Sequence, residues 1–303
     1  MTARTKAHLA LFVIALIYGL NYIVAKEVMP QFILPRGFVF MRIVGASALF
    51  FLLSIFLKSE KKIERKDWFR VFLCGFFGVS GNQLLFFEGL NLTTPINAAV
   101  IMTVTPVMVL LMSAILLNEI MGKWRVLGVA IGAIGAIILI LDTGEISLFN
   151  QDTECGNLLV LLNAATYAVY LVIVKPLMLK YDALLVIKWI FAAGVFFVLP
   201  FGIGQFAEIE WTAFTPTVIV QVVFVVVFTT FLAYLFNIYA LKTLTSSTVS
   251  IYIYLQPVFA TAIALVLAKD ILTFRTMIAA ALIFAGVYLV SFKKAGTYSK
   301  SKE

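Results

Sequence analysis

The sequence predicts an all-α integral membrane protein with ten transmembrane helices, arranged as two inverted five-helix repeats with the N- and C-termini in the cytoplasm. Three observations predict this class. The 303-residue chain is 63% hydrophobic and only 13% charged, with a mean hydropathy of +1.07. Apolar stretches of about 20 residues, enough to cross a bilayer, follow one another along the chain. The second half repeats residues of the first at an offset of about 150.

The composition excludes several classes of protein. Soluble proteins are about 45–50% apolar and about 25% charged, and a soluble fold of this size could not cover so much apolar surface. Cys74 and Cys155 indicate neither a disulfide framework nor a metal site. His8 is expected to be an interfacial residue, and no Asp lies well inside a span. We therefore expect no enzyme, no metal and no cofactor.

Ten ranges of the sequence read as membrane spans. They are 8–28, 36–57, 68–90, 93–117, 123–142, 155–175, 183–203, 217–240, 245–268 and 271–292. Pro30 and Pro35 bracket the first break, and a charged segment forms the second. Only Asn91–Thr93 separate the third and fourth spans, which predicts a tight hairpin, and Thr94-Pro95 is expected to help start the fourth.

Basic residues orient these spans, because cytoplasmic loops are rich in Lys and Arg. With the N-terminus inside, 16 of the 23 Lys and Arg fall in cytoplasmic segments, three in external segments and four within spans. The two basic clusters, in residues 58–70 and 293–302, lack the interleaved aromatic residues that stack nucleic-acid bases. The net charge of +8 is therefore a topology signal, and the expected partners are the lipid bilayer and a small-molecule substrate, with no nucleic acid.

Matched residues define the repeat. The pairs are Tyr18 with Tyr167, Lys26 with Lys175, Arg42 with Lys188, Pro106 with Pro257, Glu119 with Asp270 and Gly135 with Gly286. Because each copy holds an odd number of spans, the second copy enters the membrane with the opposite orientation. Inverted halves can open to opposite sides around a midplane site, which is the basis of alternating access. The predicted units are residues 1–142, an external linker 143–154, residues 155–292 and a cytoplasmic basic tail 293–303.

Several motifs taken together resemble a known family. They are Asn21-Tyr22 after Gly19, Arg42, the stretch from Asn82 to Glu119, and the glycines Gly128, Gly132 and Gly135. They are similar to the EamA family of the drug/metabolite transporter superfamily. The resemblance implies a ten-helix carrier of the inner membrane, often an exporter of amino acids or related metabolites, with a cavity lined by spans 1, 3, 4, 6, 8 and 9. In the second half Asp270 replaces the family's usual Glu, and Tyr170 stands where the first half has Asn21.

Neutral polar residues inside the spans are the candidates for lining a substrate cavity, with interhelical hydrogen bonding as their alternative role. They are Asn21, Tyr22, Asn82, Gln83, Asn97, Thr103, Tyr167, Tyr170, Tyr234, Asn237, Tyr252 and Gln256, and Thr105, Asn163 and Tyr254 belong to the same set. Hydroxyls, amides and tyrosine rings suit a small zwitterionic or aromatic metabolite.

Charges inside the spans need a partner or water, because a charge at bilayer depth costs at least about 2.5 kcal/mol. Lys26 and Lys175 either snorkel to the headgroups or gate their own halves, and Glu88 is a candidate partner of Lys26. Glu88 is alternatively a proton-coupling acid. Arg42 lies deeper and is expected to pair with a carboxylate or helix-end carbonyls, or to attract an anionic substrate group. Lys188 completes this predicted gating and charge network.

Two matched prolines and a glycine-rich helix bear on how the predicted helices bend and pack. Pro106 and Pro257 interrupt corresponding helices, as static kinks or as hinges. The glycines of span 5 permit close packing, either internal or in a weak homodimer, so we expect a monomer or a weak dimer. The expected function is transport of small metabolites across the cytoplasmic membrane by alternating access. A nucleotide-sugar or sugar-phosphate exchanger is the alternative, favoured if two or more basic residues converge on the cavity, and a channel or scaffold is a further class.

Overall fold

The computed structural model describes residues 2–57, 62–117, 123–140, 151–243 and 252–292, and the regular structure within these ranges is helical, with no strand. Two long helices open the chain, and the third predicted span is built from three helical segments in direct succession. The elements of the first half are α1 (Ala3–Val28), α2 (Pro35–Phe56), η1 (Arg65–Asp67), α3 (Trp68–Gly75), the π-helical η2 (Phe76–Ser80), α4 (Gly81–Leu92), α5 (Pro95–Met102), α6 (Thr105–Leu117) and α7 (Lys123–Ile140).

The second half contains a second π-helical segment. Its elements are α8 (Gln151–Lys180), α9 (Ala183–Ala207), η3 (Trp211–Ala213), α10 (Pro216–Val223), the π-helical η4 (Phe224–Leu232), α11 (Ala233–Thr243), η5 (Tyr252–Tyr254), α13 (Leu255–Val266) and α14 (Phe274–Phe292). Residues 151–154 of the predicted linker 143–154 form the first turn of α8. Glu119, the other linker residues and the tail 293–303 lie outside the described residues.

Two Thr-Pro pairs begin helices. Thr94 accepts a hydrogen bond from the Asn97 backbone N–H at 3.2 Å, and Pro95 occupies the first helical position, where a missing N–H leaves no bond unmade. The same arrangement starts α10, where Thr215 accepts from the N–H of Val218 at 3.3 Å. The predicted start of the fourth span at Thr94-Pro95 is therefore confirmed.

The break between α5 and α6 follows from Pro106. Proline has no N–H to bond the carbonyl four residues earlier, which belongs to Met102. The Thr105 hydroxyl donates to that carbonyl at 2.6 Å, and the Thr103 hydroxyl donates to another carbonyl of the last turn of α5 at 2.6 Å. Pro257 likewise lies in the first turn of α13, after the 3₁₀ turn η5. Both prolines thus stand in the first turn of an α-helix.

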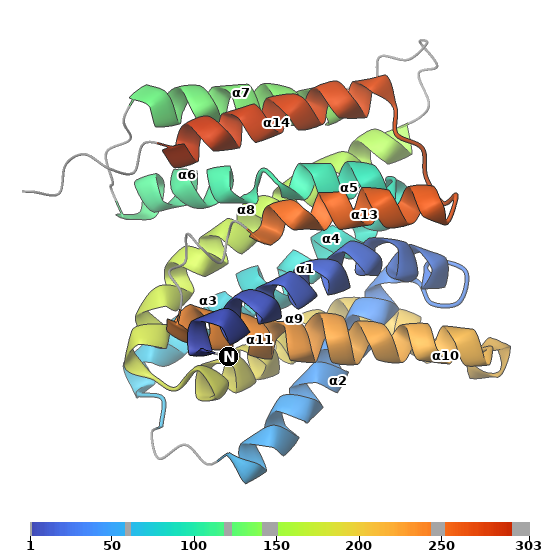
Figure 1. Ribbon diagram of the computed structural model, residues 1–303. Helices are drawn as coiled ribbons and strands as arrows, with labels where there is room; N and C mark the ends of the chain where they lie inside the picture. The colour runs from blue at the N-terminus through green and yellow to red at the C-terminus, as the bar shows by residue number, and fades with distance from the viewer. Residues whose placement is uncertain (1, 58–61, 118–122, 141–150, 244–251, 293–303) are drawn as a thin grey trace, which may run out of the picture.

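The bundle is built from helices of both halves. Figure 1 shows α7 and α14 side by side at one edge of the bundle, while α2 lies toward the opposite edge and packs against α9. Between these edges α4 packs on α8, and α1 packs on α13 and α11. The buried core is one large cluster that draws residues from most helices, together with a small cluster between α1 and α11. Each half therefore buries its apolar surface mainly against the other half.

Glycines bring helices into close contact at two of these crossings. A Cβ on Gly286 of α14 would lie 2.5 Å from the carbonyl oxygen of Gly128 and 2.6 Å from the nitrogen of Gly132, both on α7. The glycine face predicted on α7 therefore packs inside the bundle, against α14. Gly89 of α4 and Gly156 of α8 pack in the same way, each with the other's carbonyl oxygen 2.8 Å from the position of an added Cβ.

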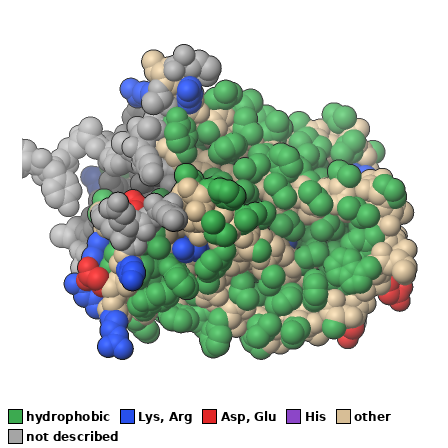
Figure 2. All heavy atoms as spheres, turned by 90° about the horizontal axis from the view of Figure 1, so that it is seen from below, with side chains coloured by type: hydrophobic (Ala, Val, Ile, Leu, Met, Phe, Trp, Pro, Cys, Tyr) green, Lys and Arg blue, Asp and Glu red, His purple; other side chains and the backbone are tan. Residues whose placement is uncertain are grey.

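The outer surface suits lipid. Phe196 is 65% exposed and Val220 is 67% exposed, and many other large apolar side chains are similarly uncovered. Figure 2 shows hydrophobic side chains over most of one face, with Lys and Arg gathered at one end and Asp and Glu at both ends. Among the described residues six helices are long and apolar enough to cross a membrane, and four shorter apolar helices accompany them. The chain is a multi-pass membrane protein, while the count of ten spans stays a prediction.

Candidate functional site

Two π-helical turns, η2 and η4, share one hydrogen-bond pattern about 150 residues apart in the sequence. The Ser80 hydroxyl donates to the carbonyl of Gly75 at 3.3 Å, and the Thr230 hydroxyl donates to the carbonyl of Val225 at 3.0 Å. Each hydroxyl reaches the residue five positions earlier, as the wider π turn allows. Because π turns are rare and occur often at functional sites, they direct attention to the groups that bond them.

Arg42 of α2 reaches the second π turn. Its side chain is deeply buried, and the residue is 4% exposed. Nε and Nη2 lie 3.2 and 2.9 Å from the hydroxyl oxygen of Thr230, and Nη2 also donates to Thr229 at 3.2 Å. The ring of Phe87 covers the guanidinium, with its centroid 4.2 Å from Cζ. The expectation of a carboxylate or helix-end carbonyl partner for Arg42 is wrong, because hydroxyls take that place.

Tyrosines gather around Arg42 and the first π turn. Four of them lie within electrostatic range of one another, namely Tyr18, Tyr167, Tyr170 and Tyr234. Arg42 lies within electrostatic range of Tyr18 and Tyr234. Tyr234 donates its hydroxyl to the carbonyl of Gly78 in η2 at 3.2 Å, and the ring of Tyr170 occupies the space where a side chain on Gly78 would stand. The four rings come from α1, α8 and α11, so this cluster joins both halves of the chain.

Four buried polar atoms near this cluster lack a hydrogen-bond partner among the described residues. They are Asn21 Oδ1, Arg42 Nη1, Gln83 Oε1 and Asn163 Oδ1. Leaving a buried polar group unpaired costs about 1–3 kcal/mol, and more for a charged group. A polar molecule that supplies the missing partners is therefore favoured here, and such groups in a native protein mark candidate binding positions.

Helical spacing places the three amides beside the cluster. Asn21 follows Tyr18 by three residues on α1, and Asn163 precedes Tyr167 by four on α8. Gln83 precedes Phe87 by four on α4, and Phe87 is the ring that covers Arg42. Residues three or four apart share one face of a helix. The amides thus lie on the same helix faces as the residues that surround Arg42.

Asn82 and Tyr22 have mainly structural contacts. The side-chain amide of Asn82 donates to the backbone carbonyl of Asn163 at 3.1 Å, and Asn163 donates back to the carbonyl of Asn82 at 2.8 Å. This reciprocal pair ties α4 to α8, the interhelical role that was the alternative for Asn82. Tyr22 is buried against Phe86, with ring centroids 5.5 Å apart in an edge-on arrangement.

The other predicted cavity residues are placed as follows. Asn97 accepts a hydrogen bond from Thr276 of α14 at 3.1 Å, and Thr103 bonds within its own helix. The Tyr252 hydroxyl lies 2.9 Å from Nδ1 of His8. Asn237 on α11 and Gln256 on α13 are half-buried.

The predicted site residues omit Tyr18, Thr229 and Thr230. Tyr18 carried a signal, because it matches Tyr167 in the repeat, and the two tyrosines share one cluster. The two threonines stand in the apolar run VVVFTTFL and carried a weaker signal, since a Thr pair in such a run often only bonds its own helix.

Lys26 and Glu88 do not pair with each other. Lys26 Nζ donates to the carbonyl of Leu90 at 3.2 Å and to that of Thr93, at the end of α4. Glu88 accepts from Arg36, with Nε 2.6 Å from Oε1. The predicted pair is therefore wrong, because Arg36 at the start of α2 takes the carboxylate. Lys26 instead satisfies carbonyls that the helix end leaves free.

Lys175 and Lys188 lie in different surroundings from their expected repeat partners. Lys175 is exposed on α8. Lys188 of α9 is half-buried, 3.4 Å from the hydroxyl of Ser54 and above the rings of Phe51 and Trp189. Neither resembles the buried setting of Arg42, so the offset of 146 that matches Arg42 with Lys188 pairs two unlike environments.

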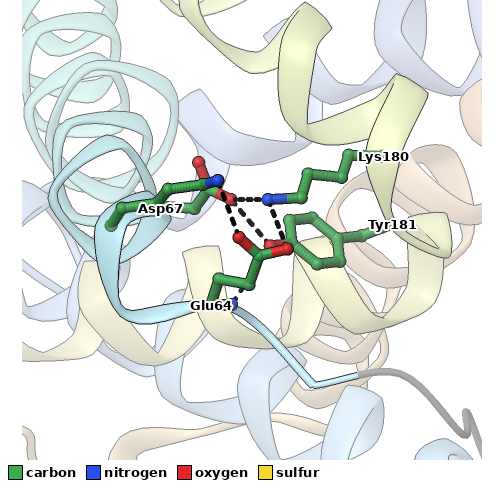
Figure 3. Close-up of polar contacts among 5 residues, drawn as sticks. Glu64, Asp67, Lys180 and Tyr181 are labelled. Atoms are coloured by element: carbon green, nitrogen blue, oxygen red, sulfur yellow. Dashed lines mark hydrogen bonds and ion pairs between the residues drawn. The ribbon is translucent and has the colours of Figure 1, made fainter.

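Polar side chains at one end of the bundle form a compact set of ion pairs and hydrogen bonds, drawn in Figure 3. Lys180 Nζ lies 2.6 Å from Asp67 Oδ2 and 2.7 Å from Glu64 Oε1. The Tyr181 hydroxyl donates to Asp67 at 2.7 Å and accepts from the Glu64 backbone N–H at 3.1 Å. Hydrogen bonds from Lys180 and Lys66 hold the pKa of Glu64 below its ordinary value. We call these contacts the Lys180 latch, which ties the end of α8 to the segment before α3.

A second polar set joins the end of α1 to the second half of α10 and to Lys269, which follows α13. Glu27 accepts from the Gln221 side chain at 2.6 Å, and its other carboxylate oxygen lies 2.8 Å from Lys269 Nζ. We call these contacts the Glu27 latch. Nearby, Asp270 accepts the backbone N–H of Ile96 in the first turn of α5 at 2.9 Å. Both latches therefore connect the two halves of the chain.

The fold and the site define a class: a multi-pass helical membrane protein with a buried polar site between its two halves. Comparison with known proteins is consistent with this class. The model of the EamA-like transporter family matches residues 5–141 and 155–292. An uncharacterized transporter of Archaeoglobus fulgidus is 27% identical over 292 residues, covering 96% of this chain and 99% of the relative.

Other relatives extend the similarity to bacteria and plants. The uncharacterized transporter YyaM of Bacillus subtilis is 25% identical over 274 residues, covering 90% of this chain and 89% of the relative. A WAT1-related protein of Arabidopsis thaliana is 23% identical over 321 residues, covering 96% and 86%. One solved structure matches with a TM-score of 0.62 at 18% identity, over 95% of this chain and 97% of that chain, and shows a shared fold alone.

The chain belongs to the EamA-like transporter family, and thus to the drug/metabolite transporter superfamily. It is a membrane transporter, in a family that is not normally enzymatic. The resemblance expected from the sequence is confirmed.

Proposed function

We propose that this protein moves a small metabolite, an amino acid or a related compound, out across the cytoplasmic membrane by alternating access. The single observation that carries the proposal is the buried site between the halves, where Arg42 and three amides have unsatisfied hydrogen-bonding atoms. A midplane site enclosed by two repeats is the arrangement by which secondary transporters work. In this proposal residues 1–142 and 155–292 are five-helix repeats of opposite orientation, joined by an external linker, and the tail after residue 292 is cytoplasmic.

The packing of the helices supports the repeat. If the two halves are repeats, α1 corresponds to α8 and α4 corresponds to α11. The contact of α4 with α8 then requires a counterpart between α11 and α1, and both contacts are present. The repeat likewise requires η2 on α9 to correspond to η4 on α2, and both are present. The repeat exchanges α7 with α14 and α2 with α9, so each of these two contacts is its own counterpart. The two segments that the family model matches have the same division.

A glycine pair refines the alignment of α2 with α9. A Cβ on Gly45 would lie 2.9 Å from Val226 in η4, and a Cβ on Gly194 would lie 2.6 Å from Val79 in η2. These glycines therefore play the same part at an offset of 149. At this offset Arg42 corresponds to Phe191, which packs on Tyr234 with centroids 5.0 Å apart. The site is thus asymmetric, because the cation Arg42 in the first half corresponds to the aromatic ring of Phe191 in the second half.

The latches supply the two gates of the proposed cycle. With the N-terminus inside, the Lys180 latch lies at the cytoplasmic end and the Glu27 latch at the external end. The two latches join corresponding helices, since α8 with α3 corresponds to α1 with α10. Breaking one while the other holds opens a single side, and the breaks beside Pro106 and Pro257 give α6 and α13 places to pivot.

The charge of the site favours an amino acid over a sugar phosphate. Among the described residues Arg42 is the one cation that acts on the tyrosine cluster. Lys26 is engaged with helix-end carbonyls, and Lys188 lies over the aromatic rings of Phe51 and Trp189. A nucleotide-sugar or sugar-phosphate exchanger, which would need two or more converging basic residues, is the less favoured candidate.

Counterflow in proteoliposomes tests the function. Purified protein is reconstituted with each of the twenty amino acids inside in turn, and uptake of the same labelled amino acid from outside is measured. We expect saturable uptake that internal substrate accelerates for at least one amino acid. Uptake that is linear in concentration and indifferent to internal substrate would indicate a channel. Uptake only of labelled sugar phosphates would instead establish the alternative cargo.

A further inference from the structure

Arg42 is a buried cation that none of the described carboxylates contacts. Arg side chains keep their charge in proteins, and a buried charge is costly unless it is paired. The described groups that act electrostatically on Arg42 are Tyr18 and Tyr234, which are neutral at ordinary pH. Thr229 and Thr230 supply hydroxyl acceptors only. The positive charge is therefore solvated but not neutralised by these groups.

The geometry leaves one nitrogen of the guanidinium open. Nε and Nη2 are occupied by the two threonine hydroxyls, and the ring of Phe87 covers a face of the group. Nη1 is buried without a partner among the described residues. Its two N–H groups are donors only, so the missing partner is an acceptor, and a carboxylate forms the stronger, charge-assisted bond.

Acceptor oxygens on the neighbouring helix faces complement the rest of such a ligand. Asn21 Oδ1, Gln83 Oε1 and Asn163 Oδ1 are unpartnered among the described residues. Each lies one helical turn from a residue of the Arg42 and tyrosine cluster. Amide oxygens accept hydrogen bonds from an ammonium group without adding a negative charge. The site therefore offers one cation and several neutral acceptors, which is the complement of a zwitterion with one carboxylate.

We propose that Arg42 Nη1 binds the carboxylate of the transported substrate, which is a small zwitterionic monocarboxylate whose ammonium group meets the free amide oxygens. This proposal rests on the proposed function and names the side chain that binds the carboxylate of its substrate. A dianionic phosphate is a poor fit, because a second negative charge would be left without a cation in a buried site.

The test compares carboxylates with their carboxamides on the unaltered protein. The thermal unfolding midpoint in detergent is measured against increasing concentrations of the twenty amino acids and of their amides, which keep the ammonium and side chain but lose the negative charge. We expect at least one amino acid to raise the midpoint saturably, and its amide to bind at least about tenfold more weakly. Equal stabilisation by an amide, or no stabilisation by any amino acid, overturns the proposal.

Variants assign the effect to Arg42. Arg42→Gln should abolish the preference for the carboxylate, and Arg42→Lys should weaken it, because lysine keeps the charge but not the planar fork. Lys6→Gln removes one exposed positive charge and should change nothing. An Arg42→Gln protein that retains the preference overturns the assignment. Counterflow that persists in Arg42→Gln with unchanged KM removes this proposal while leaving the transport function in place.

Discussion

Arg42 Nη2 lies 2.9 Å from the hydroxyl oxygen of Thr230, and the two residues stand 188 positions apart in the sequence. This bond joins α2 of the first half to the π-helical η4 of the second, within the buried site. At the other π turn, η2, the Tyr234 hydroxyl likewise reaches in from elsewhere in the fold and donates to the Gly78 carbonyl. The irregular turns thus present bonding groups to the site that a regular α-helix would keep within itself.

Replacing Thr230 by Val should destabilise the protein. The change keeps the shape of the side chain but removes an acceptor from a buried guanidinium, at a cost of about 1–3 kcal/mol. We expect the thermal midpoint in detergent to fall. Thr212→Val alters an exposed threonine of the loop before α10 and serves as the control. Equal midpoints for the two variants would show that the bond to Arg42 contributes nothing.

The contact between α7 and α14 should be intolerant of a methyl group. Gly286→Ala places a Cβ 2.5 Å from the Gly128 carbonyl oxygen, so the helices must separate, at a cost of about 1–3 kcal/mol. Gly204→Ala on α9 is the matched control, because nothing lies within 4 Å of its added Cβ, and alanine favours a helix over glycine. We expect a lower midpoint for the first variant and an unchanged or higher one for the second. The opposite order would contradict this packing.

Glu88 should prove a plain surface pair. Its side chain is 27% exposed and that of Arg36 is 51% exposed, and such pairs contribute about 0–1 kcal/mol. Glu88→Gln should therefore leave the pH profile of counterflow unchanged. Lys26→Met should lower the midpoint more, because it leaves the carbonyls of Leu90 and Thr93 without their donor. A pH profile lost in Glu88→Gln would establish the acid as a coupling group instead.

The Lys180 latch should weaken in acid. The folded pKa of Glu64 is lowered, so the stabilisation it gives is fully present above its ordinary value of 4.5 and is lost as the pH falls through the lowered value. We expect the thermal midpoint to fall on acidification below about pH 4.5, with a smaller fall in Glu64→Gln. Glu208→Gln, at an exposed carboxylate, is the control. An equal fall in all three proteins would show that the latch does not titrate.

Much of the fold could be predicted from the sequence, because hydropathy and helix-start signals are local. The helix start at Thr94-Pro95 and the break between α5 and α6 before Pro106 are examples. The two π turns could not be predicted, since most of their residues are apolar and the few hydroxyl residues fit a regular helix equally well. They are explained by tertiary bonds, such as that of Arg42 with Thr230.

Residues of the candidate site could be predicted in part from the sequence. The partners expected for Arg42 and Lys26 are wrong. Burial of Arg42 followed from its depth in an apolar run, but the choice of hydroxyls over a carboxylate depends on helix η4, which is far away in the sequence. Glu88 was assigned to Lys26 because both approach the same end of their spans. Arg36 lies closer once α2 is packed beside α4, and no sequence pattern encodes that arrangement.

The central claim is that the two ends of the bundle open in turn. Val24 on α1 and Ile173 on α8 lie at an offset of 149, each near one latch, and serve as single-cysteine reporters after Cys74 and Cys155 are replaced. Labelling by a membrane-impermeant thiol reagent is measured in vesicles of each orientation. Lys180→Gln should raise labelling at position 173 and lower it at position 24, and Glu27→Gln should do the reverse. Labelling that rises at both positions together would contradict alternating access.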